Sequence, residues 1–152
     1  MRKSVKTACL TCVILMFVPA VTLANGTKGG RAAAFDWEPV IKAIIEVESM
    51  GDPKAVDKGG KSCGILQITA TLVKDCNRIQ KMRNSQTRYT MDDRFNVRKS
   101  KEMFLLYQSY YNPRNDIEQA IRSWNGGMRY TKHGTQKYFE KVMRKLKGDV
   151  SK

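Results

Sequence analysis

The chain has 152 residues, of which 41% are hydrophobic and 9% aromatic, and its formal net charge is +14. This length suits one domain, and the apolar content excludes an intrinsically disordered chain. The strong positive charge favours anionic partners, such as nucleic acid, anionic lipid or a carboxylate-rich cell wall.

The first 24 residues have the three-part pattern of a secretory signal peptide. Arg2, Lys3 and Lys6 form a positive start, residues 8–18 are almost entirely apolar, and Thr22-Leu23-Ala24 resembles a cleavage site. The apolar run is shorter than the roughly 20 residues of a membrane span, although an uncleaved anchor is an alternative. Cleavage would remove three basic residues and no acidic ones, lowering the net charge from +14 to +11. We therefore expect export to the periplasm or cell envelope of a bacterium, which makes nucleic acid the weakest of the three partners.

The rest of the chain predicts a flexible leader over residues 25–35 and one mainly α-helical domain over residues 36–148. Apolar residues recur at steps of three and four along most of this domain, and strand signals are almost absent. The polar, Gly-rich residues 52–64 predict a loop. The expected helices cover 36–48 with Asp36 as N-cap, 70–80, 96–111, a segment from Asn115 or Asp116 to Asn125, and a segment capped by Thr135 that carries Tyr138, Phe139, Val142 and Leu146.

Two cysteines, Cys63 and Cys76, follow the predicted cleavage point. In an oxidising compartment they could form a disulfide, and two buried free thiols are the alternative. With two cysteines and the lone His133, no metal site built by the protein is expected, and no cofactor is implied. His133 also lacks the nucleophile motif that a Ser-His-Asp arrangement would need.

Glu48 is the first candidate for chemistry, because it ends a strongly apolar helix just before the Gly51-Asp52-Pro53 turn. Partial burial there would raise its pKa and keep the carboxyl protonated, as a general acid requires. Most glutamates at helix ends are solvated, so this position alone is a weak signal.

The surrounding motifs strengthen the case for Glu48. Glu48-Ser49 is followed by Asp52-Pro53-Lys54-Ala55-Val56 and Ser62-Cys63-Gly64-Ile65-Leu66-Gln67-Ile68, then by Ser123-Trp124-Asn125-Gly126-Gly127 and Thr135-Gln136-Lys137-Tyr138. This succession resembles the soluble-type lytic transglycosylase domain, which belongs with the lysozyme-like folds. The resemblance covers about residues 38–146. It implies a glycan-binding groove between helices and loops.

By this resemblance Glu48 matches the catalytic acid/base of the family, and Ser49 matches a neighbour close to the acid and the sugar. Gln67 and Asn125 match groove-lining amides, and Tyr138 matches a groove-facing tyrosine. Trp124 stands where tyrosine is commoner. It also falls on an apolar helix face, so we expect it in the core rather than as a sugar platform. Four further basic residues could attract stem-peptide carboxylates or simply be solvated: Arg78, Lys81, Arg83 and Arg88.

The resemblance implies a lytic transglycosylase that cleaves peptidoglycan between N-acetylmuramic acid and N-acetylglucosamine with formation of a 1,6-anhydro product. Most glycosidases use two carboxylates, and here one has supporting context. The closest alternative is a goose-type lysozyme-like hydrolase, but Thr69 stands where that group has an aspartate. Its water-activating base would have to be another aspartate, and none has supporting context: Asp57, Asp75, Asp92 or Asp93.

A non-catalytic wall-binding module is a further alternative. For each of these three functions we expect a monomer that binds glycan strands. The sequence has no motif that chooses between wall turnover, division, and a secretion or conjugation apparatus as the setting.

Overall fold

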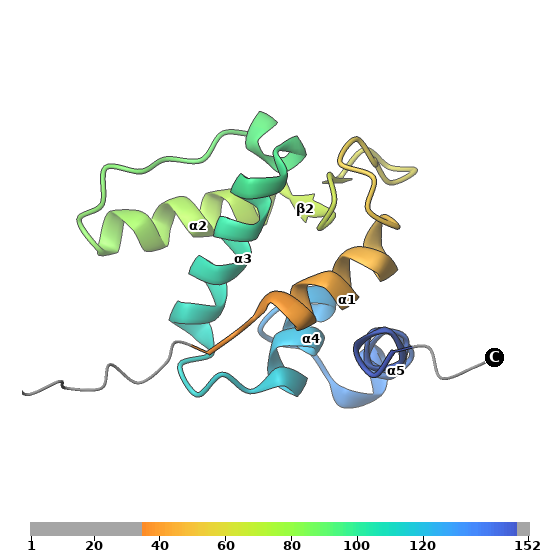
Figure 1. Ribbon diagram of the computed structural model, residues 1–152. Coiled ribbons are helices and arrows are strands. Elements are labelled where there is room, and N and C mark those ends of the chain that lie inside the picture. Colours follow the sequence, from red (N-terminus) through yellow and green to blue (C-terminus); the bar gives the residue numbers. More distant parts are fainter. Residues whose placement is uncertain (1–34, 149–152) are drawn as a thin grey trace, which may run out of the picture. The chain divides into compact units, whose positions relative to one another are not determined.

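The computed structural model describes residues 35–148 (Figure 1). Within this range the chain is mainly α-helical, which confirms the predicted fold class. The predicted signal peptide, and the predicted leader up to residue 34, lie outside the described residues. The elements in chain order are α1 (Glu38–Glu48), β1 (Ser62–Cys63), β2 (Ile68–Thr69), α2 (Ala70–Met82), the 3-10 helix η1 (Asp92–Phe95), α3 (Val97–Tyr111), α4 (Ile117–Gly126) and α5 (Lys132–Leu146).

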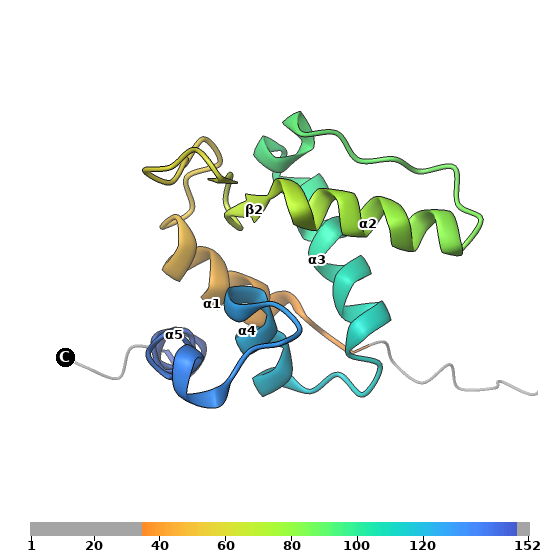
Figure 2. The same ribbon diagram turned by 180° about the vertical axis from the view of Figure 1, so that it is seen from behind.

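The helices bury one apolar face each in a common core. Helix α1 packs against α5, α5 packs against α4, and α2 packs against α3 (Figures 1 and 2). Phe104 of α3 links these pairs, because its ring centroid lies 5.8 Å from that of Trp37 and 5.0 Å from that of Trp124. The fully buried side chains around it come from several elements and include Ile41, Ile44, Leu66, Ile68, Ile79, Met103 and Ile121.

Two helix starts differ from the sequence prediction. Helix α1 has Trp37 as its N-cap, and Asp36 instead accepts a hydrogen bond from the Glu38 N–H at 2.9 Å. Helix α5 begins one turn before the predicted cap, because Thr131 accepts from the Gly134 N–H at 3.1 Å. The predicted cap, Thr135, is buried inside α5. Both threonines are good cap residues, so residue type alone does not choose between them.

A small antiparallel hairpin interrupts the loop predicted between α1 and α2. Ser62 pairs with Thr69 and Cys63 with Ile68. The turn between them packs tightly on η1: Gly64 has φ +74°, and a Cβ there would lie 1.8 Å from the Arg94 carbonyl oxygen. Only glycine fits both the backbone angle and the space. The turn is therefore held in one place against η1.

The two cysteines are separate buried thiols, so the disulfide weighed from the sequence is not formed. Cys63 lies in the hairpin, whereas Cys76 faces α3 and its Sγ lies 3.6 Å from the Met103 carbonyl oxygen. Burial raises the pKa of the Cys76 thiol to about 12. The two cysteines pack in different elements. They are therefore two buried free thiols, the second alternative that the sequence left open.

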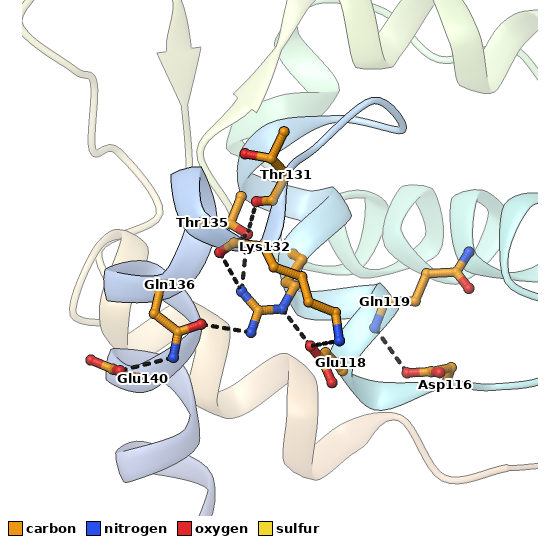
Figure 3. A network of polar contacts seen from close by, with 9 residues as sticks. Asp116, Glu118, Gln119, Thr131, Lys132, Thr135, Gln136 and Glu140 are labelled. Atoms are coloured by element: carbon orange, nitrogen blue, oxygen red, sulfur yellow. Dashed lines mark hydrogen bonds and ion pairs between the residues drawn. The ribbon is translucent and has the colours of Figure 1, made fainter.

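A buried guanidinium joins α4 to α5. Arg122 of α4, only 3% exposed, donates to Glu118 at 2.7 Å and to the Lys132 carbonyl oxygen at 3.0 Å. It also donates to Thr135 Oγ1 at 3.1 Å and to Gln136 Oε1 at 2.9 Å (Figure 3). These contacts attach the first turn of α5 firmly to α4.

Candidate functional site

A cavity of about 280 Å³ lies where four segments meet. Its walls come from the end of α1, the hairpin and the loop before it, the start of α2, and the end of α4. The cavity brings together three residues that the sequence singled out, Glu48, Gln67 and Asn125. The full lining is Glu48, Asp57, Ser62, Gln67, Ile68, Thr69, Leu72, Trp124 and Asn125.

Glu48 is the last residue of α1 and is half-buried. The hydroxyl of Tyr138, on α5, donates to Glu48 Oε1 at 2.6 Å. Burial raises the pKa of Glu48 because it disfavours the charged carboxylate, and the hydrogen bond from Tyr138 lowers it by a smaller amount. Burial and the neighbouring Glu48 charge also raise the pKa of Tyr138, so its hydroxyl keeps its proton. A carboxyl of this kind keeps its proton to higher pH than an ordinary glutamate, and it can give that proton and accept one back.

Ser49 does not line the cavity. Its Oγ donates to the Ile65 carbonyl oxygen at 2.9 Å and accepts from the Gly51 N–H at 3.2 Å. The hydroxyl therefore ties the end of α1 to the hairpin turn. This contact holds the backbone next to Glu48.

Gln67 and Asn125 present amide groups to the cavity. Gln67 has φ +48°, and its Nε2 donates to the carbonyl oxygens of Gly64 at 2.9 Å and Ala55 at 3.3 Å. Its Oε1 has no donor among residues 35–148, and the exposed Asn125 side chain has no hydrogen-bond partner in the same range. These free amide atoms suit the hydroxyl and N-acetyl groups of a sugar.

Trp124 belongs both to the core and to the cavity wall. Its ring packs on Phe104 and Tyr107, and its Nε1 donates to the Leu66 carbonyl oxygen at 3.1 Å. It also lines the cavity beside Asn125. The expected core position is therefore correct only in part, because Trp124 is partly buried against the core and also lines the cavity.

Asp57 is a second carboxylate in the cavity, although the sequence provided no context for it. Its Oδ1 accepts from the N–H groups of Lys61 at 2.6 Å and Ser62 at 3.0 Å. These bonds hold the Gly-rich loop in a turn between Asp57 and Ser62. An aspartate followed by Lys-Gly-Gly is typical of such a turn, but nothing in the spacing indicates that the turn faces Glu48.

The family model of the transglycosylase SLT domain matches residues 30–147 of the chain. The chain belongs to this family. Searches of curated proteins and of solved structures found no match. The SLT family acts on peptidoglycan in the cell envelope, and membership implies glycan-cleaving transglycosylase activity in general.

The cleft of this SLT domain continues past Trp124 into a second hollow of about 540 Å³. The two hollows share Thr69, Leu72, Trp124 and Asn125, and the second is mainly apolar. Arg78 also lines it, but its guanidinium is paired with Asp75 at 2.8 Å and donates to the Tyr111 hydroxyl. Along residues 35–148 no three His, Cys, Asp or Glu side chains gather as metal ligands would.

Proposed function

We propose that this SLT domain is a lytic transglycosylase that cleaves the β-1,4 bond between N-acetylmuramic acid and N-acetylglucosamine. The supporting observation is the Glu48 carboxyl, half-buried beside the Tyr138 hydroxyl and facing a cavity that Gln67 and Asn125 also line. Among the residues of that cavity it is the one whose pKa is raised by burial. Gln67 and Asn125 are the proposed sugar-binding residues, and Trp124 supplies an apolar wall.

In this mechanism Glu48 acts first as an acid and then as a base. It protonates the glycosidic oxygen, and the C1–O bond of the muramic residue breaks with help from the carbonyl oxygen of the neighbouring N-acetyl group. The Glu48 carboxylate then removes the proton of the C6 hydroxyl on the same sugar. The O6 atom attacks C1, forming the 1,6-anhydro ring and restoring the N-acetyl group. An attack from within one sugar gains from proximity and needs no second carboxylate.

Tyr138 has a supporting part in both steps. Its hydroxyl donates to the carboxylate that remains after the first proton transfer, and so holds the anion until it becomes the base. Ser49 holds the helix end through Ile65 and is assigned a positioning part rather than contact with the sugar.

The test is mass spectrometry of muropeptides released from purified peptidoglycan by the wild type and by Glu48→Gln. We expect 1,6-anhydro ends from the wild type, each one water lighter than a hydrolytic end. Glu48→Gln should lower the rate at least about 100-fold, because the amide cannot cycle a proton. The matched control is Glu46→Gln, an exposed glutamate on the same helix that should digest normally. Equal, negligible cleavage by wild type and Glu48→Gln would instead favour a wall-binding module.

A hydrolase of the goose-lysozyme type is the second candidate, and Asp57 is the observation that favours it. A carboxylate in the same cavity could activate water, which would produce reducing ends. Asp57→Asn removes the charge but keeps an oxygen for the Lys61 and Ser62 N–H groups. In the same digest we expect this variant to retain anhydro products. Reducing ends from the wild type, lost in Asp57→Asn, would contradict the transglycosylase proposal.

We also propose that the enzyme is exported after removal of residues 1–24. The supporting observations are the pattern of these residues and a family substrate that lies in the cell envelope. Within residues 35–148 no helix is long and apolar enough to cross a membrane. N-terminal sequencing of the exported protein should begin at Asn25; an intact Met1 terminus would contradict cleavage.

A further inference from the structure

A third hollow, of about 570 Å³, lies beside the candidate active site and is strongly basic. Three of its side chains are cationic, Lys61, Lys74 and Arg94, and none is acidic. They come from the Gly-rich loop, from α2 and from η1. The full lining is Gly60, Lys61, Thr69, Ala70, Thr71, Lys74, Met91 and Arg94.

These three cations have no acidic partner among residues 35–148. Arg94 donates only to the carbonyl oxygens of Met91 at 2.8 Å and Lys61 at 3.5 Å, and its guanidinium lies over the Phe95 ring. Arg78, one turn further along α2 from Lys74, is by contrast neutralised by Asp75. Like charges gathered around one hollow repel each other and create a local positive potential. An anion bound there would relieve the repulsion.

The basic hollow is continuous with the cleft. It shares Thr69 with the cavity of Glu48, and it shares Thr69, Thr71 and Lys74 with the second hollow. A polymer lying in the cleft could therefore place a side branch in the basic hollow. The position favours a substituent of the substrate over a separate ligand.

We propose that Lys61, Lys74 and Arg94 form a subsite for the carboxylates of peptides attached to the glycan. This inference rests on the proposed function, and it adds that the enzyme prefers peptide-bearing strands to bare ones. In peptidoglycan the lactyl carboxyl of muramic acid is joined to the peptide by an amide, so the carboxylates lie along the peptide branch. A guanidinium and two ammonium groups are suited to several carboxylate oxygens at once.

The test measures binding of the full exported chain, carrying Glu48→Gln, to glycan strands with intact peptides and to the same strands after amidase treatment. We expect the intact strands to bind about tenfold more tightly, since amidase removes the several carboxylates of each peptide branch and leaves one lactyl carboxylate, on the sugar itself. Adding Lys61→Gln and Arg94→Gln should abolish this preference and leave binding to bare strands unchanged. Neither residue lines the cavities of Glu48 or Trp124.

The matched control is Lys81→Gln with Arg83→Gln, which removes the same charges from the far end of α2. Arg83, like Arg94, donates a hydrogen bond to the protein, here to Ser109. The control should keep the preference. If the double variant unfolds, Lys61→Gln alone repeats the test, because Lys61 is exposed. We expect this single variant to weaken the preference for intact strands.

The inference would be overturned by no preference in the parent, by an undiminished preference in the variants, or by an equal loss on both kinds of strand. Binding that amidase leaves unchanged, but that falls when phosphate-bearing wall polymers are removed, would assign the hollow to phosphate, against this proposal. Because the assay uses an inactive background, its outcome does not depend on which bond the enzyme breaks. A failed transglycosylase mechanism would appear separately, as reducing ends in the wild-type digest.

Discussion

Glu48 and Tyr138 meet although ninety positions separate them in the sequence, and their 2.6 Å hydrogen bond sets the chemistry of the site. Two effects act on the Glu48 carboxyl in opposite directions. Burial favours the neutral acid, and the Tyr138 hydroxyl favours the anion. The first effect is larger, so the acid form persists to higher pH than in an ordinary glutamate.

Replacement of Tyr138 by phenylalanine removes the effect that favours the anion, so the pKa of Glu48 should rise further. Because the protonated form starts the reaction, the alkaline limb of the kcat/KM profile should move to higher pH. We expect kcat to fall about tenfold as the carboxylate loses its donor. The measurement is the pH dependence of peptidoglycan cleavage from pH 4 to 9.

Tyr110→Phe is the control, because the Tyr110 hydroxyl contacts Met82 and Arg78, both on α2, and not Glu48. Its pH profile should match that of the wild type. An unmoved alkaline limb in Tyr138→Phe would show that the Tyr138 hydroxyl does not influence the proton on Glu48.

At the scale of elements, the position of Tyr138 depends on how α5 lies on its neighbours. Arg122 fixes the first turn of α5 to α4 through Lys132, Thr135 and Gln136, and its guanidinium lies 4.2 Å from the Phe139 ring centroid. Phe139 directly follows Tyr138 in the chain. The polar cluster in Figure 3 therefore holds the helix that places Tyr138 against Glu48.

Arg122→Met keeps a long apolar side chain but removes every donor, leaving buried acceptors without partners. We expect the free energy of unfolding to fall by about 2 kcal/mol or more, measured by urea denaturation. Lys132→Met is the matched control, because Lys132 pairs with the same Glu118 at 3.4 Å but is 77% exposed. Exposed pairs contribute less than about 1 kcal/mol. Equal stability losses in the two variants would contradict the structural part assigned to the buried guanidinium.

At the scale of the described domain, the distribution of charge matters more than its sum. The net charge of +14 indicates anionic partners of any kind. Only the packing separates the basic residues into those already neutralised, such as Arg78, and those that surround a hollow without a partner. Lys61 and Arg94 are brought together because Gly64 lets the hairpin turn rest on the backbone of η1.

The sequence by itself determined what depends on near neighbours. Apolar residues at steps of three and four predicted the five helices, because a helix repeats every 3.6 residues and buries one stripe. The Gly51-Asp52-Pro53 turn marked the end of α1. The family resemblance that the short motifs carry implied that Glu48, Gln67 and Asn125 share one groove, and all three line one cavity.

The tertiary structure decided what depends on contacts between distant segments. Four features arise this way. Thr131 rather than Thr135 caps α5, and Tyr138 donates a hydrogen bond to Glu48. The Asp57 carboxylate lies in the cavity, and the two cysteines are separate thiols. Local propensity does not distinguish between two threonines four residues apart, nor does it tell which face of a loop meets a helix end. Those outcomes follow from which arrangement buries the most apolar surface while satisfying each polar group.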